Sequence, residues 1–354
     1  MLSVLDRMDR AEIVPVVAAP PEGPLAEALR SRNIEIMPFV THDSSAVRFS
    51  LGQLRESLDA LLRSRRWDLL HANSLSMGRL SGPVAAAWKV PSLTHLRDII
   101  KLSRQAIVDL NCHSRLLAVS CATRDYHVAA RLSAEKMHVL YNGVDLTKFC
   151  PRPADGYLHR ELRLSPGVPL IGAIGQIGLR KGHDVFCRAA APLAGKLPEV
   201  HYVLLGQRSS EKAESAALER ELRAAAGGPL AGRFHFLGFR NDVDRVLNEL
   251  TLLVHPARQE PLGRVLLEAA ASGTAIVATD VGGTREIFPP DSGAARLVPP
   301  DDAEALAQAV AELLADAALR QSMAAAARRR AEAAFDIQAA ATRLMMHYRD
   351  VANR

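Results

Sequence analysis

Short apolar runs alternate with segments of helical spacing along most of this chain. The runs that are typical of buried strands lie at 13–18, 34–36, 67–71, 91–95, 116–120 and 137–141, and again at 169–175, 201–205, 233–237, 252–254, 275–278 and 295–298. Amphipathic helical spacing is found between or after them at 22–29, 51–62, 81–88 and 336–351. Strands that alternate with helices predict an α/β protein whose parallel sheets carry helices on both faces.

Two loop signals divide the chain near its middle. Asn142-Gly143-Val144-Asp145 is a turn sequence that ends the first series of strands, and residues 151–156 form a linker rich in Pro and Gly. With 354 residues the chain is too long for one ordinary core. We therefore expect two Rossmann-like domains, at 1–155 and 156–335, followed by a C-terminal helix at 336–354.

Composition narrows the class of protein. Hydrophobic residues make up 48% and charged residues 23%, which is typical of a globular protein and excludes disorder. No apolar run reaches the length of a membrane span, and residues 1–10 lack the apolar core of a signal peptide, so we expect a cytoplasmic location. The 4 cysteines form no C-x-x-C pair, which favours reduced thiols in or near the cores over a zinc site.

The net charge of +5 favours anionic partners, either a nucleotide or a lipid surface. Basic residues are spread along the chain, and we expect their densest run, Arg328-Arg329-Arg330, to be a solvated helix face. No nucleic-acid motif accompanies them, so no nucleic-acid partner is expected. Peripheral contact with anionic lipid at the inner membrane face stays open as an alternative.

Residues 255–273 carry the densest candidate chemistry. The run at 252–254 ends in His255-Pro256, and Pro261 and Gly263 then open a helix that stops at Gly273. Glu260 precedes this helix, Glu268 lies about two turns inside it, and the free N–H groups near its start can bind a phosphate. A sugar nucleotide fits this layout, with hydroxyls on the two carboxylates. The spacing alone favours two unrelated surface acids, but the surrounding Pro and Gly residues favour the site.

Three further positions follow predicted strands, where open α/β sheets bind ligands. His95 is placed to exchange a proton or donate a hydrogen bond, with a structural histidine as the alternative. His71, beside Asn73, is equally compatible with a structural and a functional role. The turn at 175–182 lets backbone approach a phosphate, which Lys181 can neutralise, although a plain tight turn has the same glycines.

These segments together resemble the family-4 retaining glycosyltransferases, which have the GT-B fold. Residues 260–268 are similar to the E-x7-E signature, with matching flanks at 255–256 and 280–286. The turn at 175–182 resembles G-R-L-x-x-x-K-G, in which Lys181 matches the Lys and Gln176 replaces the usual Arg. The N-G-V-D element at 142–145 also matches, and the resemblance extends from about residue 21 to the C-terminus.

The resemblance implies a cleft between an acceptor-binding first domain and a donor-binding second domain, with the last helix crossing back to the first. It places His95 against the transferred sugar and makes His95, Lys181 and Glu260 the candidate catalytic residues. The implied donor-binding residues are Gly175, Gln176, Lys181, Gly238, Phe239, Arg240, Val243, Glu260, Leu262, Gly263, Arg264, Val265 and Glu268. The loop at 282–284 either packs beside the phosphates or is a mere tight turn.

The expected activity is retaining transfer of a hexose from a nucleotide-sugar co-substrate, UDP- or GDP-linked, to a glycan, lipid or small-molecule acceptor. No other cofactor is expected. Asp242-Val243-Asp244 could hold a divalent ion, but its place at the start of a helix, where acids suit the dipole, favours a metal-independent enzyme. A GT-B sugar-nucleotide epimerase and a non-catalytic sugar-nucleotide-binding remnant are the alternatives.

The beginning of the chain departs from the family pattern. Family members usually place a strand, a Gly-rich loop and a helix before the strand that matches residues 13–18, whereas residues 2–8 resemble only the end of that helix. We therefore expect the first domain to lack its first, central strand, which would leave two interior strand edges unpaired. The corresponding hypothesis is that the native product is longer than these 354 residues.

Overall fold

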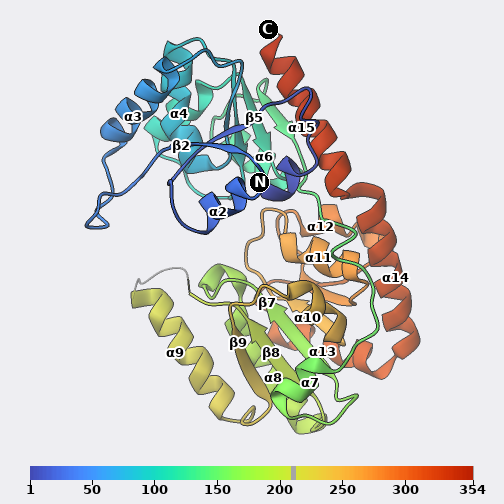
Figure 1. Ribbon diagram of the computed structural model, residues 1–354. Helices are drawn as coiled ribbons and strands as arrows, with labels where there is room; N and C mark the ends of the chain where they lie inside the picture. Colours follow the sequence, from blue (N-terminus) through green and yellow to red (C-terminus); the bar gives the residue numbers. More distant parts are fainter. Residues whose placement is uncertain (209–212, 354) are drawn as a thin grey trace. The chain divides into compact units, whose positions relative to one another are not determined.

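The computed structural model describes residues 1–208 and 213–353 (Figure 1). These residues form two compact units, Met1–Gly143 with the segment from Ile337 onward, and Val144–Asp336. The paired strands of each unit run parallel, so the predicted α/β class is confirmed. No helix in the described ranges is long and apolar enough to cross a membrane.

The strands of the first unit fall into two sheets. β1 (Val16–Ala19) pairs with β2 (Glu35–Pro38). A separate sheet has the order β3 (Leu70–Ala72), β4 (Ser92–Leu96), β5 (Arg115–Ala118), β6 (Met137–Val139). Before β1 the described chain carries the short helix α1 (Leu2–Leu5) and no strand, as predicted. The outer edges of β1 and β3 pair with no other described strand, so the described strands of this unit form two separate sheets.

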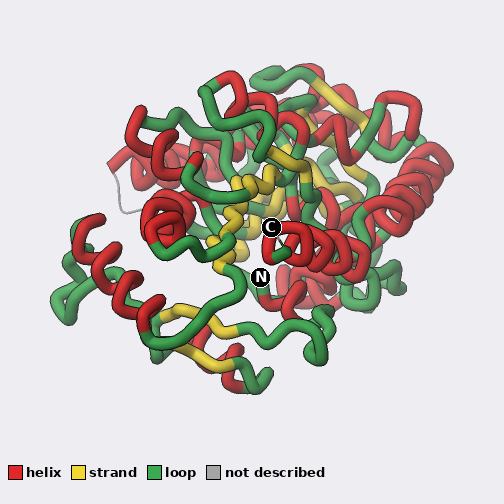
Figure 2. Tube along the Cα trace, turned by 90° about the horizontal axis from the view of Figure 1, so that it is seen from above, coloured by secondary structure: helices red, strands yellow, loops and turns green. Residues whose placement is uncertain are grey.

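The helices of the first unit include one from the far end of the chain. Those that follow strands or loops in order are α2 (Pro24–Arg30), α3 (Leu51–Arg63), α4 (Leu75–Ala87), α5 (Arg104–Asn111) and α6 (Cys121–Ala129). The C-terminal helix α15 (Ile337–Ala352) lies alongside them (Figures 1 and 2). Its Leu344 and Met345 share a buried core with Leu93 of β4 and Leu117 of β5. Burial of such side chains contributes about 1.5–3 kcal/mol each, so this core holds α15 on the unit.

The second unit is built on one six-stranded parallel sheet. Its order is β12 (Arg296–Val298), β11 (Ile276–Thr279), β10 (Leu252–His255), β7 (Leu170–Ile174), β8 (His201–Leu205), β9 (Phe234–Gly238). Its helices are α7 (Tyr157–Leu162), α8 (His183–Lys196), α9 (Ala213–Gly227), α10 (Val243–Glu249), α11 (Arg264–Ser272), α12 (Thr284–Ile287), α13 (Ala303–Ala315) and α14 (Ala317–Ala334). The strand order reverses between β7 and β10, which is where doubly wound sheets bind ligands.

Several local predictions need correction. The helix expected at 81–88 begins at Leu75, because the Ser74 side chain accepts a hydrogen bond from the backbone of Met77. Helices α5 and α6 were not predicted. The Asp302 side chain caps α13 by accepting from the Ala305 N–H.

The basic run at 328–330 is not simply a solvated face. Arg328 donates to the Phe149 and Ala271 carbonyls, and Arg330 donates to the Glu286 and Ile287 carbonyls. These four bonds tie α14 to the segment before α7, to α11 and to α12, so two of the three arginines support the fold of the second unit.

Candidate active site

Two loops follow neighbouring strands at the switch point of the six-stranded sheet. β7 is followed by the turn 175–178, a 3-10 turn at Leu179–Lys181 and then α8. β10 ends at His255 and is followed by the loop 256–263 and then α11. Because β7 and β10 are parallel neighbours, both loops lie beyond the carboxyl ends of the two central strands.

Lys181 and His255 meet on one carboxylate oxygen of Glu260. The Lys181 Nζ lies 2.5 Å and the His255 Nε2 lies 2.8 Å from Glu260 Oε2. Burial of Glu260, which is 5% exposed, opposes ionisation, but the hydrogen bond from His255 and the charge of Lys181 outweigh it and hold the pKa at about 2. Burial lowers the pKa of His255, so a neutral imidazole donates to an ionised carboxylate. Glu260 Oε1 makes no hydrogen bond to any described residue and can accept one from a ligand.

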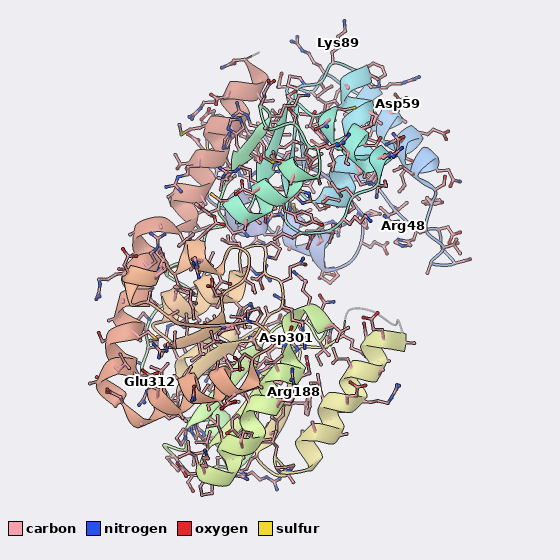
Figure 3. The ribbon with its side chains drawn as sticks, turned by 180° about the vertical axis from the view of Figure 1, so that it is seen from behind. Arg48, Asp59, Lys89, Arg188, Asp301 and Glu312 are labelled. Atoms are coloured by element: carbon pink, nitrogen blue, oxygen red, sulfur yellow. The ribbon has the colours of Figure 1, made fainter. Side chains whose placement is uncertain are left out.

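Arg258 joins the two loops. Its backbone N–H donates to the Arg180 carbonyl at 2.9 Å, and its Nη1 donates to the Leu179 carbonyl at 2.8 Å. The same guanidinium forms a bidentate pair with Asp184, at 2.8 and 2.6 Å, and reaches Asp301 at 2.6 Å. Asp301 is labelled in Figure 3, and so is Arg188, which lies 3.6 Å from Asp184. A bidentate arginine fixes geometry in two directions, so the turn that carries Lys181 is held against the loop that carries Glu260.

The loop at 282–284 supports the backbone of Glu260. The Gly283 N–H donates to the Glu260 carbonyl at 2.9 Å. Gly282 has a φ of +52°, and a Cβ at this position would lie 2.0 Å from the same carbonyl oxygen. This predicted glycine loop therefore packs directly against one candidate catalytic residue.

Helix α11 begins with an open first turn. Gly263, with a φ of +97°, is its N-cap and provides no side-chain cap. The backbone N–H groups of Arg264 and Val265 make no hydrogen bond to described residues, so they can donate to an anion. Pro261 lies three positions before the helix rather than in its first turn, and Gly273 ends the helix with a φ of +68°, as predicted.

Glu268 is the fifth residue of α11, so it lies little more than one turn inside the helix, not two. Its side chain is 17% exposed, and the Nε of the exposed Arg264 lies 3.5 Å from its Oε1. Burial outweighs this cation and raises the pKa of Glu268 to about 7. The two acids of the signature therefore differ in ionisation near neutral pH.

The predicted residues after β9 are only partly available. Phe239 is 65% exposed and Gln176, on the turn after β7, is also exposed. The Arg240 guanidinium is already paired, with Asp242 at 2.8 Å and with Glu161 at 2.7 Å. Val243 is the first residue of α10. At this turn the Phe239 side chain is accessible to a ligand, whereas the Arg240 side chain is held by Asp242 and Glu161.

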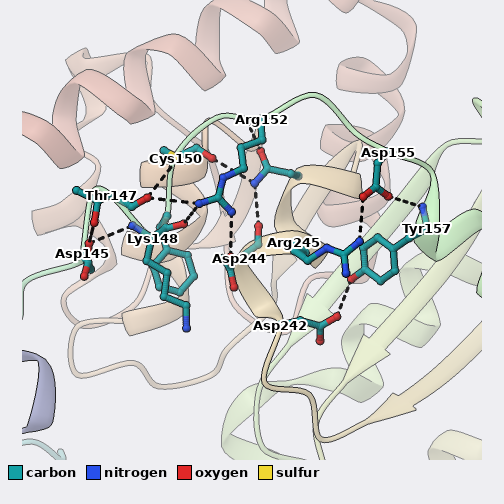
Figure 4. A network of polar contacts seen from close by, with 12 residues as sticks. Asp145, Thr147, Lys148, Cys150, Arg152, Asp155, Tyr157, Asp242, Asp244 and Arg245 are labelled. Carbon is teal, nitrogen blue, oxygen red and sulfur yellow. Dashed lines mark hydrogen bonds and ion pairs between the residues drawn. The ribbon is translucent and has the colours of Figure 1, made fainter. Parts of the chain in front are cut away.

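Both acids of the Asp-x-Asp sequence have protein partners (Figure 4). Asp242 accepts from Tyr157 Oη at 3.0 Å as well as from Arg240, and Arg152 Nη1 lies 3.0 Å from Asp244. No group of three or more His, Cys, Asp or Glu side chains that could hold a metal ion is found in the described ranges.

In the first unit, His71 and His95 belong to a chain of three rings. The Tyr348 hydroxyl lies 2.6 Å from His71 Nδ1, and His71 Nε2 lies 2.9 Å from His95 Nδ1. Beside them, Arg97 donates to the side-chain oxygens of Asn73 at 2.8 Å and Asn142 at 3.0 Å. These residues lie at the carboxyl ends of β3 and β4 and after β6, on one edge of the four-stranded sheet.

Comparisons with known proteins identify the family. Residues 1–148 match the family model of Glycosyltransferase Family 4, and residues 168–316 match that of Glycosyl transferases group 1. A phosphatidyl-myo-inositol mannosyltransferase of Mycolicibacterium smegmatis is 30% identical over 349 residues, which cover 91% of this chain and 84% of that protein. The chain is a group 1 glycosyltransferase. The lipopolysaccharide core mannosyltransferase LpcC of Rhizobium leguminosarum is 38% identical over 184 residues, about half of each protein (51% and 50%).

Solved structures show the same fold for this glycosyltransferase. HepE of Anabaena, crystallised with UDP and glucose, has a TM-score of 0.83 at 24% identity, with 98% of this chain and 94% of that chain covered. Sucrose-phosphate synthase of Thermosynechococcus elongatus has a TM-score of 0.73 at 21% identity, with 94% and 95% covered. The expected GT-B fold is thereby confirmed.

Two residues beside the candidate site residues, one in each unit, were not predicted from the sequence. Arg258 lies two residues before Glu260, and this short spacing between a base and an acid could have drawn attention to it. Tyr348 is 277 residues away from His71 in the sequence, and no local pattern connects them.

Proposed function

We propose that this group 1 glycosyltransferase is a retaining enzyme that moves a hexose from a UDP- or GDP-linked donor to a glycan or lipid acceptor. The observation that carries the proposal is the cluster of Lys181, His255 and Glu260 beside the open N-terminus of α11. A fixed cation, a fixed carboxylate and free N–H groups at one sheet edge match the charges and hydroxyls of a nucleotide sugar.

The leaving diphosphate defines the role of Lys181. Negative charge develops on the diphosphate as the sugar–oxygen bond breaks, and preorganised cations and N–H groups stabilise it. Lys181 and the N–H groups of Arg264 and Val265 provide this stabilisation. Glu260, through its unbonded Oε1, accepts from a sugar hydroxyl, and Glu268 accepts from the ribose.

No metal is needed for this arrangement. The acids of the Asp-x-Asp sequence are engaged by Arg240, Tyr157 and Arg152. The diphosphate charge is instead neutralised by Lys181 and the α11 N-terminus. We therefore expect transfer to persist in the presence of a chelator such as EDTA, and its loss would contradict the metal-independent arrangement.

The type of donor is supported by the relatives. The names of two relatives describe mannosyltransferases, and HepE was crystallised with UDP-glucose. A thermal-shift screen with UDP, GDP, UDP-glucose and GDP-mannose identifies the base, because a ligand at 100 times its dissociation constant stabilises the native state by about 2.7 kcal/mol. Proton NMR of the product then shows whether the anomeric configuration is retained.

Replacement of Lys181 by Met tests the proposed chemistry. We expect transfer to fall by about 100- to 1,000-fold, the range for loss of one oxyanion-stabilising group. Lys196→Met is the matched control, because Lys196 is exposed at the end of α8. Unchanged transfer in Lys181→Met would remove the residue from this role. Release of free nucleotide only when an acceptor is present would support transfer over epimerisation, and binding without turnover on a broad acceptor panel would favour a non-catalytic protein.

His95 is proposed to contact the transferred sugar. His95→Ala should lower transfer while the affinity for UDP stays within about twofold of the wild type, because the nucleotide-binding loops belong to the second unit. An equal loss of UDP binding and of transfer would indicate a structural histidine instead.

A further inference from the structure

The hydrogen bonds of the three-ring chain in the first unit are all donated in one direction, from Tyr348 towards His95. Its Tyr348 comes from α15, His71 from β3 and His95 from β4. The 2.6 Å distance between the Tyr348 oxygen and His71 Nδ1 is shorter than the usual range for an N–H donor and falls in the range of an O–H donor. Burial raises the pKa of Tyr348 above its usual range, so the phenol keeps its proton. His71 is its only hydrogen-bond partner among the described residues, so the hydroxyl donates to His71 Nδ1.

The tautomers of both imidazoles follow from this donor. Burial, with the charge of Arg97, lowers the pKa of His71 to about 3, and burial lowers the pKa of His95 well below its ordinary value. Both rings are therefore neutral, and each has one N–H and one acceptor nitrogen. Because His71 Nδ1 accepts, His71 Nε2 carries the proton and donates to His95 Nδ1 at 2.9 Å. The proton of His95 must then reside on Nε2.

We propose that Tyr348 and His71 are positioning residues that lock His95 as the Nε2–H tautomer, so that its outer nitrogen is a fixed hydrogen-bond donor to an oxygen of the transferred sugar. This inference rests on the proposed role of His95. Nε2 of His95 has no partner among the described residues, which leaves this N–H to a ligand. A ring whose outer nitrogen always carries the proton cannot serve as a general base through that atom.

The position of Tyr348 is fixed by its neighbours on α15. Arg115, which begins β5 and is 3% exposed, donates to Asp350 at 3.0 Å and lies 2.6 Å from His347 Nδ1. Leu344 and Met345 are buried in the core of the same unit. The contacts of Arg115 with α15 and the apolar contacts of Leu344 and Met345 thus fix the position of the helix, and with it the position of the Tyr348 hydroxyl.

Nitrogen NMR of the histidines measures the tautomer directly and needs no substrate. The full chain is labelled with ¹⁵N-histidine, and the His95 signals are assigned by their loss in His95→Gln. We expect the Nε2–H pattern in the wild type and a fall of roughly 2- to 10-fold in the ratio of Nε2–H to Nδ1–H tautomer in Tyr348→Phe, as removal of one hydrogen bond implies. Tyr126→Phe, on the exposed Tyr126 of the same unit, is the control and should leave the pattern unchanged. An Nδ1–H tautomer of His95 in the wild type, or no change in Tyr348→Phe, would overturn the proposal.

Substitution of His71 separates positioning from packing. In His71→Gln the amide oxygen can accept from Tyr348 while the amide nitrogen donates to His95, whereas His71→Leu can do neither. We expect Gln to keep most of the turnover and Leu to lose roughly 2- to 10-fold in kcat, with UDP affinity unchanged in both. Equal turnover of the Gln and Leu variants would contradict the positioning role. If His95 has the expected tautomer but His95→Ala transfers sugar normally, the three-ring chain does set the tautomer, and only the proposed contact of His95 with the sugar is wrong.

Discussion

Replacement of Glu268 by Gln should stabilise the second unit at alkaline pH. Burial raises the pKa of Glu268 from its ordinary value of 4.5 to about 7, so the folded protein holds a proton that the unfolded chain releases. The resulting stability is fully present below pH 4.5 and is lost as pH rises through 7. Each pKa unit corresponds to 1.36 kcal/mol, so the ionised carboxylate costs about 3 kcal/mol above this range. A Gln has no such cost at any pH.

Urea unfolding at about pH 5 and about pH 8.5 measures this difference. The 2 tryptophans, Trp67 and Trp88, both belong to the first unit, so their fluorescence reports only that unit while far-UV circular dichroism reports both. Between these pH values the second unit of the wild type should lose about 2.5 kcal/mol more than that of Glu268→Gln, because a small part of the effect is already lost at about pH 5. Glu221→Gln, on an exposed position of α9, is the control and should follow the wild type. A pH dependence that is the same in wild type and Glu268→Gln would refute the buried, proton-holding carboxyl.

Three further outcomes are expected. If UDP binds beside Glu268, calorimetry near pH 7 in buffers of different ionisation enthalpy should show a proton exchanged on binding, and this exchange should vanish in Glu268→Gln. Gly182→Ala should destabilise the second unit by about 3 kcal/mol in urea unfolding, because Gly182 has a φ of +65° and a Cβ there would lie 1.9 Å from the Pro256 carbonyl oxygen. Gly178→Ala is the control: the space around Gly178 is open, so stability should change by less than about 0.5 kcal/mol. Arg258→Ala should weaken UDP binding about tenfold by calorimetry, because the turn with Lys181 loses its anchor, while Arg188→Ala should not.

Much of the strand pattern could be predicted because strands of parallel sheets are continuous apolar runs. Residues 201–205 were predicted with the observed bounds of β8. Helices buried on several sides were harder. In α4, seven residues including Gly78, Ser81 and Gly82 are buried, so small and polar residues replace the expected apolar stripe. In α5, the buried Asp109 interrupts the apolar face and conceals the helix.

The candidate site shows a similar limit. Lys181 and Glu260 follow strands whose carboxyl ends meet, so a sequence pattern predicts that they are close. The contacts that hold the surrounding segments in place join residues that are distant in the sequence. Asp184 and Asp301, which hold Arg258, lie 74 and 43 residues from it in the sequence, and Tyr348 is still more distant from His71. Such contacts depend on the packing of whole elements and leave no periodic trace in the sequence.

The two acids of the signature have identical side chains but opposite pKa shifts, which come from their surroundings. Glu260 is the more buried of the two, at 5% exposure, yet it is ionised because two donors share its Oε2. Glu268 has only exposed cations nearby, Arg264 and Lys148, and keeps its proton up to about pH 7. Pairs of carboxyl groups whose environments separate their pKa values commonly divide acid and base or charge and hydrogen-bond duties. Here Glu260 supplies a constant negative charge that holds Lys181 in place, and Glu268 changes charge near neutral pH. An exchange of the two environments would therefore be needed to exchange their roles, because the side chains themselves are identical.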